Sequence, residues 1–374
     1  MSRPQLAWRR RFLTTTGLGL VTLPLAGAAG QEKAPDELRV GVIGTGDRGK
    51  AHLRAITKIP GIRVTALCNT NKERLGQGAR IAEAHKPTTF DNYRKLLDHK
   101  DLDAVFVVTP CNLHKEMAVA TLESGRHCYC EKPIAITVAD LEALGKVVRG
   151  TDRVFQVGLQ LRYGAPWAPT VRAVREGAIG KPVLIRAHRY NVRDIAPHKT
   201  WFFKRAESGD IIVEQAVHEF DLFNWVFGKL PTRAAGFGGR AVQNKPARDI
   251  MDHYTLSLEY GPNQRVSYSH CWFGSASDPH PGRQELVFGD GKMADLEAGK
   301  IHDRLSKEIT PVNGGGPRSD PTSLAIADFR RCIREKKPPL SDFEAGRNCV
   351  LTALLGRRAI DEGRAVTMKE LLRG

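Results

Sequence analysis

Residues 38–56, LRVGVIGTGDRGKAHLRAI, contain the feature that most restricts how this chain can fold. A short apolar run is followed at once by glycines spaced Gly44-x-Gly46-x-x-Gly49, and then by residues that favour a helix. In this context the spacing predicts a dinucleotide-binding turn: Gly44 permits the tight turn, Gly46 lets the backbone approach a pyrophosphate, and Gly49 lets the helix pack closely. The helix N-terminus would then face the phosphates. The candidate cofactor-binding residues of this turn are Gly44, Gly46, Asp47, Arg48 and Gly49.

Strand and helix patterns continue to alternate up to about residue 158. Apolar runs that predict strands fall at 62–68, 103–110, 127–130 and 154–158, and helical patterns fall between them at 72–85, 92–97, 113–124 and 138–149. The run at 103–110, DAVFVVTP, predicts a strand buried on both faces. Together these patterns predict a Rossmann domain with a doubly wound parallel sheet over residues 36–158.

The second predicted strand is expected to end in an acidic residue that binds the adenosine ribose, about 20 residues past the glycines. The residue at that place is Asn69, which can donate a hydrogen bond to the ribose but carries no charge to repel a 2′-phosphate. Lys72 and Arg74 follow it and would attract such a phosphate. The sequence therefore leaves NAD and NADP both open, and Asn69 as a simple turn residue is a further alternative.

The first 28 residues have the pattern of an export signal. Arg9-Arg10 stands just before Phe12-Leu13, and a mildly apolar, glycine-interrupted stretch with an alanine-rich end follows. This is typical of a twin-arginine signal, whose passengers are exported already folded. Two alternatives remain: a segment that targets nothing, and an uncleaved membrane anchor, although a spanning helix needs about 20 strongly apolar residues. We expect export to the periplasm or another extracytoplasmic place.

The charge and the cysteine content of the chain limit which other classes of protein it can belong to. The chain has 57 Lys and Arg against 41 Asp and Glu, a formal net charge of +16, but the basic residues are spread out. No nucleic-acid motif accompanies them, so we expect a solvated basic surface and no nucleic-acid partner. The chain has seven cysteines, an odd number, and it is long enough to fold without disulfide bonds. We therefore predict free thiols.

Three stretches together resemble the glucose–fructose oxidoreductase/inositol dehydrogenase (Gfo/Idh/MocA) family. The first is the glycine turn, the second is residues 101–135, and the third is residues 208–228, SGDIIVEQAVHEFDLFNWVFG. The second stretch matches the family pattern at Thr109-Pro110, His114 and Glu131-Lys132-Pro133. The resemblance implies an NAD or NADP cofactor, with NAD slightly favoured. It adds Thr109, Pro110, His114 and Glu131 to the candidate cofactor-binding residues, beside Asn69.

The resemblance also implies a second α/β domain, here 159–374, with a large, open, mostly antiparallel sheet. In this family that sheet often pairs with another subunit or covers a sugar site, which implies a homo-oligomer and a carbohydrate substrate. The sequence agrees, since strand patterns occur at 183–190, 233–241, 254–259, 266–272, 284–288 and 292–296. A flexible loop is predicted at 313–321, NGGGPRSDP, before C-terminal helices.

Oxidation of a secondary alcohol needs a hydride acceptor, a base for the hydroxyl proton and a group that stabilises the developing alkoxide. Lys132 follows a predicted parallel strand, where ligands bind, and its ammonium is the candidate for the last role. A single helix over 211–227 would place Glu214 and His218 on one face, so that Glu214 orients the imidazole and His218 acts as the base. The family more often has Asp at position 214, and Asp221 is expected to be structural. No metal site is predicted, because His218 and Asp221 have no third ligand.

The residues predicted to contact the substrate rest on weaker sequence evidence. They are Arg162, Tyr163 and Trp201, of which Trp201 could stack on a sugar ring, and His188, Tyr190 and His198 fall where the second domain would face the cleft. Each of these side chains could equally pack in the interior.

The leading hypothesis is an exported NAD(P)-dependent oxidoreductase that acts on a sugar or polyol hydroxyl and retains its cofactor. The first alternative is a glycoside hydrolase of the same fold, which oxidises the sugar transiently, cleaves by elimination and returns the hydride. The second is a sugar-binding protein without turnover, which Lys132 and His218 argue against.

Overall fold

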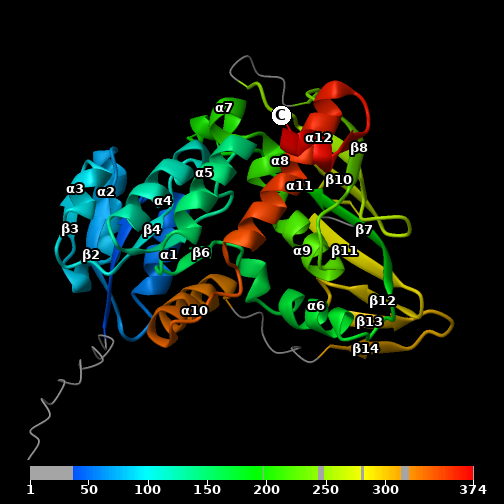
Figure 1. The fold of residues 1–374 in the computed structure, drawn as a ribbon, viewed down its shortest axis with the longest axis horizontal. Helices are drawn as coiled ribbons and strands as arrows, with labels where there is room; N and C mark the ends of the chain where they lie inside the picture. The colour runs from blue at the N-terminus through cyan, green and yellow to red at the C-terminus, as the bar shows by residue number, and fades with distance from the viewer. Residues whose placement is uncertain (1–36, 197, 243–247, 279–281, 313–319, 374) are drawn as a thin grey trace, which may run out of the picture. The chain divides into compact units, whose positions relative to one another are not determined.

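The computed structural model describes residues 37–196, 198–242, 248–278, 282–312 and 320–373 (Figure 1). The predicted signal at 1–28 lies outside these residues, as does most of the predicted loop at 313–321. Within the described residues, no helix has both the length and the apolar character needed to cross a membrane.

The first half folds into a six-stranded parallel sheet, sheet A, in the order β3-β2-β1-β4-β5-β6. This is the Rossmann order, and the crevice at its topological switch lies between β1 and β4. Five of the six residues of β1 are buried, and the sixth is Arg39. A sheet covered on both faces requires such burial. The strands are β1 (Leu38–Ile43), β2 (Ile62–Cys68), β3 (Thr88–Phe90), β4 (Ala104–Val107), β5 (His127–Cys130) and β6 (Phe155–Val157). The helices are α1 (Asp47–Ile56), α2 (Lys72–Ile81), α3 (Tyr93–Leu97), α4 (His114–Glu123) and α5 (Val138–Arg149).

The second half contains a nine-stranded sheet, sheet B, in the order β14-β13-β12-β11-β7-β10-β9-β8-β15. Its pairs are antiparallel except β7 with β10, which confirms the predicted open, mostly antiparallel sheet. The patterns did not predict the short strands β13, β14 and β15. The strands are β7 (Pro182–Tyr190), β8 (Arg233–Gly239), β9 (His253–Glu259), β10 (Arg265–Cys271), β11 (Gly282–Gly289), β12 (Lys292–Asp295), β13 (Lys300–Asp303), β14 (Ile309–Pro311) and β15 (Val366–Thr367).

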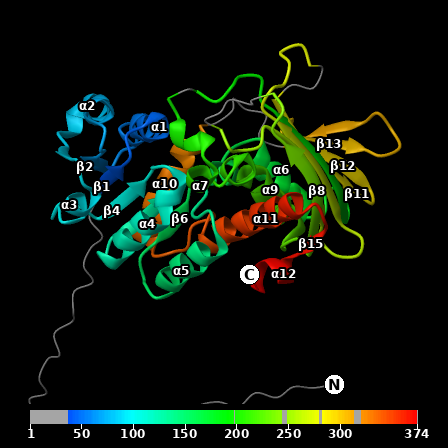
Figure 2. The ribbon, with the colours of Figure 1, turned by 90° about the horizontal axis from the view of Figure 1, so that it is seen from above.

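Helices cover one face of sheet B, and its other face is open. α9 (Val217–Phe227) and α11 (Phe343–Glu362) pack against the covered face (Figure 2). β9 alternates buried Tyr254 and Leu256 with exposed Thr255 and Ser257, which is the period-2 signature of a sheet with one solvated face. The other helices of this half are α6 (Trp167–Arg175), α7 (Arg205–Ser208), α8 (Ile211–Glu214) and α12 (Met368–Arg373).

Helix α10 (Pro321–Glu335) comes late in the chain but packs on the Rossmann half. Its Phe329 stacks edge-on against Phe106 of β4 and Tyr129 of β5, and α10 contacts α1 (Figure 1). The C-terminal part of the chain therefore completes the core of the N-terminal sheet.

The predicted single helix over 211–227 is wrong in one respect. The chain is not helical at Gln215 and Ala216, so α8 and α9 are separate helices. The carbonyl oxygen of Glu214, at the end of α8, accepts a hydrogen bond from Lys132 Nζ at 2.6 Å. A side chain from the other half of the molecule thus satisfies a backbone group at this break.

Candidate active site

A cavity of about 840 Å³ lies at the carboxyl ends of the central strands of sheet A. Its walls include the residues at or just after the ends of β1, β2, β4 and β5, and the second half contributes Gln160, His198, Lys199, Trp201, Glu214 and His218. This is the edge at which open parallel sheets bind ligands. Of the residues predicted from the sequence, those on the cavity wall are Gly44, Gly46, Asp47, Arg48, Asn69, Thr109, Pro110, His114, Glu131, Lys132, Trp201, Glu214 and His218.

The glycine turn has the geometry that its spacing predicts. Gly44 has φ +97°, and a Cβ there would lie 2.3 Å from the carbonyl oxygen of Val108. A Cβ on Gly49 would lie 1.9 Å from the carbonyl oxygen of Gly44, so only glycine lets α1 begin so close to β1. Gly46 has open space on its cavity side, where the nearest heavy atom to a Cβ is Arg74 Nη1 at 3.9 Å. The turn therefore presents bare backbone to a ligand at the N-terminus of α1.

Asn69 is held at the end of β2 by two hydrogen bonds. Its Nδ2 donates to Thr45 Oγ1 at 3.1 Å, and its Oδ1 accepts from the backbone amide of Asn71 at 2.9 Å. Asn69 thus braces the glycine turn against the turn that follows β2. Arg74 lines the same end of the cavity.

Glu131 lies beneath the glycine turn and is nearly fully buried. Its Oε1 accepts hydrogen bonds from Arg48 Nε at 2.8 Å and His52 Nε2 at 2.7 Å. Burial opposes ionisation of this carboxyl, but the charge of Arg48 and the bond from His52 outweigh it and hold the pKa of Glu131 well below its usual range. Glu131 therefore ties the end of β5 to α1 and positions the cofactor turn.

His114 connects the two turns that follow β4 and β5. Its Nε2 lies 2.8 Å from the carbonyl oxygen of Thr109, and its Nδ1 lies 2.7 Å from that of Pro133. The ring is 1% exposed, so its contribution is to hold these turns in register at the cavity floor.

Lys132 is bound at its Nζ by Glu214 alone among the described side chains. Nζ donates to the Glu214 carbonyl oxygen at 2.6 Å and to Glu214 Oε1 at 2.9 Å. An ammonium has three donors, so one N–H of Lys132 is left for a ligand in the cavity. The predicted partnership is thereby corrected: because the helix breaks after Glu214, this carboxylate holds Lys132 and does not hydrogen-bond the imidazole of His218.

His218 is the second residue of α9 and is 7% exposed on the cavity wall. Burial, and then the charges of Lys132, Arg189 and Arg283, lower its pKa well below the usual value. The imidazole is therefore neutral near pH 7, which is the form that can accept a proton. Its buried Nδ1 has no hydrogen-bond partner among the described residues.

Two family models match the chain, one for each half. The first, described as an oxidoreductase family with an NAD-binding Rossmann fold, matches residues 38–159. The second, the C-terminal domain of the same GFO/IDH/MocA family, matches residues 170–294. The chain belongs to this family.

Individual family members are similar over most of the chain. Myo-inositol 2-dehydrogenase of Thermotoga maritima is 27% identical over 90% of this chain and 100% of its own length. A glycosyl hydrolase family 109 protein of Shewanella pealeana is 30% identical over 67% of this chain and 64% of its own. The match to inositol 2-dehydrogenase of Salmonella typhimurium spans only 55% of that protein. Among solved structures, levoglucosan dehydrogenase in complex with NADH has TM-score 0.76 and 20% identity, covering 89% of this chain and 99% of its own.

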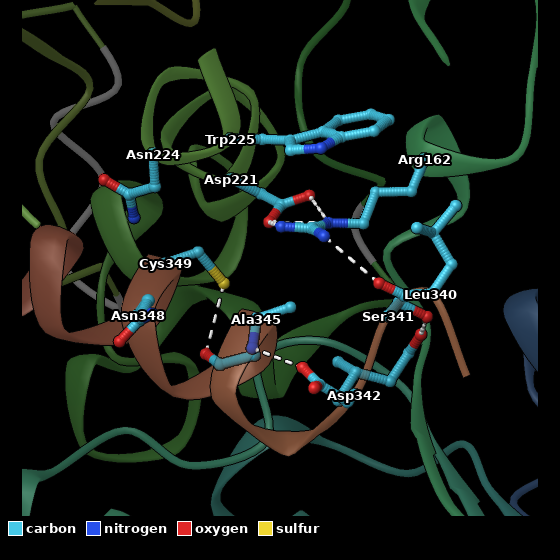
Figure 3. Close-up of polar contacts among 12 residues, drawn as sticks. Arg162, Asp221, Asn224, Trp225, Leu340, Ser341, Asp342, Ala345, Asn348 and Cys349 are labelled. Carbon is cyan, nitrogen blue, oxygen red and sulfur yellow. Dashed lines mark hydrogen bonds and ion pairs between the residues drawn. The ribbon is translucent and has the colours of Figure 1, made fainter. Parts of the chain in front are cut away.

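Two predicted substrate contacts do not lie on the cavity wall of this Gfo/Idh/MocA protein. Arg162 forms a buried ion pair with Asp221, in which Nη2 and Nε lie 2.7 and 2.8 Å from its two carboxylate oxygens, and Nη1 donates to the Leu340 carbonyl (Figure 3). The hydroxyl of Tyr163 lies 3.0 Å from Ser341 Oγ. These residues join the loop after β6 to α9 and to the segment before α11, so the structure does not bring Arg162 and Tyr163 to the cavity wall, and it pairs Asp221 with Arg162.

The motifs missed several wall residues. Gln160 and Lys199 are on the wall, as are Asp91, which precedes α3, and Tyr93 and Arg94 at its start, and no recognisable spacing marks any of them. The only sequence signal was the position of 198–201 between two predicted elements of the second half. All seven cysteines are free, and six of them are buried.

Proposed function

We propose that this protein is a nicotinamide-dinucleotide-dependent oxidoreductase acting on a secondary hydroxyl of a sugar, sugar derivative or polyol. The observation that carries the proposal is that Lys132, Glu214 and His218 line the same cavity as the glycine turn. A hydroxyl in that cavity would lie beside a base, a cation and the place for a hydride acceptor, which are the three requirements of alcohol oxidation. The names of the inositol and levoglucosan dehydrogenases support this substrate class.

The residues of the cavity fit a dinucleotide. The bare backbone of the glycine turn suits a pyrophosphate, and Asn69 suits the adenosine ribose. When bound, the nicotinamide accepts a hydride from the carbon that carries the hydroxyl. We propose NAD as the cofactor because the Rossmann model that matches is described as NAD-binding. NADP is the alternative, since Asn69 carries no charge to repel a 2′-phosphate and Arg74 lines the same cavity.

In this proposal His218 accepts the proton of the substrate hydroxyl, because its imidazole is neutral and on the cavity wall. The free N–H of Lys132 donates to the same oxygen and stabilises the negative charge that develops there. Glu214 is a positioning residue, since its two contacts fix the direction of the Lys132 side chain.

We further propose export through Arg9 and Arg10, with the cofactor loaded before export and retained. Free dinucleotide is scarce outside the cytoplasm, so retention requires a dissociation constant far below micromolar, or about −10 kcal/mol or tighter. A retained cofactor must be returned to its starting state on the same protein. We also propose that the open face of sheet B, where Leu184 and Phe237 are exposed, forms a homo-oligomer contact.

Redox-neutral glycoside cleavage is the second candidate. The similarity to a glycosyl hydrolase family 109 protein favours it, and so does a retained cofactor, because the hydride removed first would be returned after elimination. The same His218 and Lys132 would serve the oxidation step.

One experiment separates these candidates. The purified protein is denatured, and the supernatant is analysed by chromatography and mass spectrometry for NAD(H) or NADP(H). Intact protein is then given inositols, free sugars and aryl glycosides, with and without added dinucleotide. Reduced dinucleotide formed with a free polyol supports the oxidoreductase, whereas release of the aryl group without added dinucleotide supports the hydrolase. Protein that neither carries nor binds dinucleotide would refute both.

A further inference from the structure

The connection between β7 and α7, described at 191–196 and 198–204, reaches from the second half to the phosphate end of the cavity. We call it the crossing segment. His198 Nε2 lies 2.7 Å from Oδ2 of Asp47, the first residue of α1. Lys199 and Trp201 line the cavity directly after this contact.

The crossing segment is anchored to the second half by side chains that are distinct from its cavity contacts. Arg248, 5% exposed at its side chain, donates to both carboxylate oxygens of Asp194 at 2.9 and 2.8 Å. Trp272 Nε1 donates to the carbonyl oxygen of Arg193 at 2.8 Å, and Phe202 and Phe203 are buried. Toward the Rossmann half, His198 of the described part of this segment contacts Asp47, and Lys199 and Trp201 lie on the cavity wall.

Asp47 places a carboxylate at the phosphate end of the cavity, and two basic side chains face it: Lys50 Nζ lies 3.6 Å from Asp47 Oδ1, and His198 Nε2 of the crossing segment lies closer, 2.7 Å from Oδ2. Asp47 stands where backbone amides of α1 would meet the phosphates, so its carboxylate would repel them. The hydrogen bond from His198, followed by the nearby charges of His198, Lys199 and Lys50, lowers the pKa of Asp47, which is therefore ionised at neutral pH. Lys199 Nζ has no carboxylate within ion-pair distance among the described residues, so its charge remains available to a ligand.

We propose that His198 and Lys199 form a clamp that the second half closes over the pyrophosphate of the bound dinucleotide. Lys199 supplies a positive charge to the phosphates, and His198 offsets the carboxylate of Asp47. The clamp rests on the proposed function, since it assigns residues to retention of the proposed cofactor. It also divides the phosphate site between the two halves of the chain, so that release of the dinucleotide requires the crossing segment to withdraw.

The first test removes the charge of Lys199. Lys199→Ala is compared with Arg193→Ala, which removes one positive charge from an exposed position of the same segment that does not line the cavity. Dissociation constants of NAD+, NADH, ADP and adenosine are measured by calorimetry on protein stripped of cofactor, and release of NADH is followed by its fluorescence. We expect Lys199→Ala to weaken NAD+, NADH and ADP about tenfold, to speed NADH release by a similar factor and to leave adenosine unchanged. Arg193→Ala should change each value less than twofold.

The second test examines the pair formed by His198 and Asp47. We expect His198→Ala to weaken dinucleotide binding about threefold to tenfold, and His198→Ala with Asp47→Asn to restore it, because the carboxylate that has lost its hydrogen bond from His198 is then gone. Both positions are exposed, so melting temperatures should stay close to wild type.

The outcomes separate the clamp from the proposed function. A wild-type protein that binds no dinucleotide overturns the proposed function and the clamp with it. A wild-type protein that binds dinucleotide, with Lys199→Ala equal to Arg193→Ala or with adenosine weakened as much as ADP, overturns the clamp alone. A failure of Asp47→Asn to relieve His198→Ala overturns the role given to His198.

Discussion

At the scale of single residues, the site depends on one lysine held between two halves of the molecule. Lys132 leaves the end of β5 and is fixed by both the carbonyl and the carboxylate of Glu214 at the end of α8. His218 stands four residues further along, buried and neutral. In the proposed mechanism the break between α8 and α9 has a role, because Glu214 at this break binds Lys132 and does not hydrogen-bond the imidazole of His218.

We expect Lys132→Met and His218→Asn each to lower kcat by about 10²–10⁴, because each removes a positioned acid–base or charge-stabilising group. Glu214→Gln should lower kcat less, by about tenfold, since the Glu214 carbonyl still holds Lys132. Steady-state kinetics on the preferred substrate measure these effects, with the melting temperature as the folding control. Full activity in Lys132→Met or His218→Asn would remove that residue from the mechanism.

The pH dependence of the reaction should reflect the lowered pKa of His218. An ordinary histidine has a pKa of about 6.5, so a base of that kind loses activity as the pH falls through 6.5. His218 stays neutral below that pH, and the acidic limb of kcat/KM should therefore lie below pH 6.5. Rate profiles from pH 4.5 to 9 test this, and an acidic limb at or above 6.5 would contradict the environment described for His218.

The ion pair of Arg162 with Asp221 makes a prediction about stability. Asp221 is 1% exposed, and removal of its partner leaves a buried carboxylate without its cation. We expect Arg162→Met to lower the free energy of unfolding by about 3–5 kcal/mol, and Arg162→Met with Asp221→Asn to recover part of the loss. Denaturant titrations measure both. The dissociation constant for dinucleotide should change little in either variant, and a large change would return Arg162 to the ligand site.

At the scale of elements, the start of α1 is set by contact between backbone atoms. Helix α1 approaches β1 so closely that a methyl group at Gly49 would overlap the carbonyl of Gly44. The start of this helix, at Gly46, Asp47 and Arg48, lies on the cavity wall. Packing of this helix and binding of a phosphate therefore depend on one glycine.

We expect Gly49→Ala to weaken dinucleotide binding by at least tenfold and to lower the melting temperature, because α1 must move away from the turn. Gly76→Ala in α2 is the matched control, since the nearest heavy atom to its Cβ would be 3.9 Å away. That control should stabilise the protein by about 0.5–1 kcal/mol, as alanine favours a helix interior. Calorimetry and thermal melting measure the pair, and equal behaviour of the two variants would refute the close approach.

At the scale of the whole molecule, buried histidines join elements in both halves. His52 of α1 and His270 of β10 are each fully enclosed, and burial is the main cause that lowers the pKa of both. Burial also lowers the pKa of His127, at the start of β5, to about 4. The native state therefore keeps these rings neutral at a pH where the unfolded chain binds protons.

The lowered pKa values of these histidines predict that the protein loses stability in acid. A histidine whose pKa is lower in the folded state stabilises the fold fully above about pH 6.5, and the stability falls as the pH drops from 6.5 toward the folded pKa. Glu285 and Asp210, with pKa values raised by burial to about 7 and about 6, act in the opposite direction and offset part of the loss. We expect a net fall on the order of 1–3 kcal/mol between pH 7 and pH 5. Denaturant melts across this range measure it, and His270→Gln should reduce the slope; a flat or rising profile would contradict the prediction.

The sequence by itself determined the Rossmann half and the position of its glycine turn, because local patterns encode both: apolar runs alternate with helical patterns, and the glycines directly follow the first run. Alternating apolar runs indicate a parallel sheet, and the constraints on Gly44 and Gly49 come from residues within a few positions or from the adjacent strand. The motif around Lys132 and the wall position of His218 were likewise predicted.

Only the tertiary structure decided which side chains meet in the site. Lys132 and Glu214 are 82 residues apart in the chain, and Asp47 and His198 are 151 apart, so no local period encodes either contact. The repeat of apolar residues over 211–227 suits one helix, but Lys132 binds the Glu214 carbonyl where that helix breaks, and the carboxylate turns toward it. Arg162 is a third example, since Asp221, 59 residues further along the chain, neutralises its charge in the interior. Long-range pairing of charged side chains assigns these roles. For the buried pair of Arg162 and Asp221, an unpaired charge would cost more than any local preference can offset.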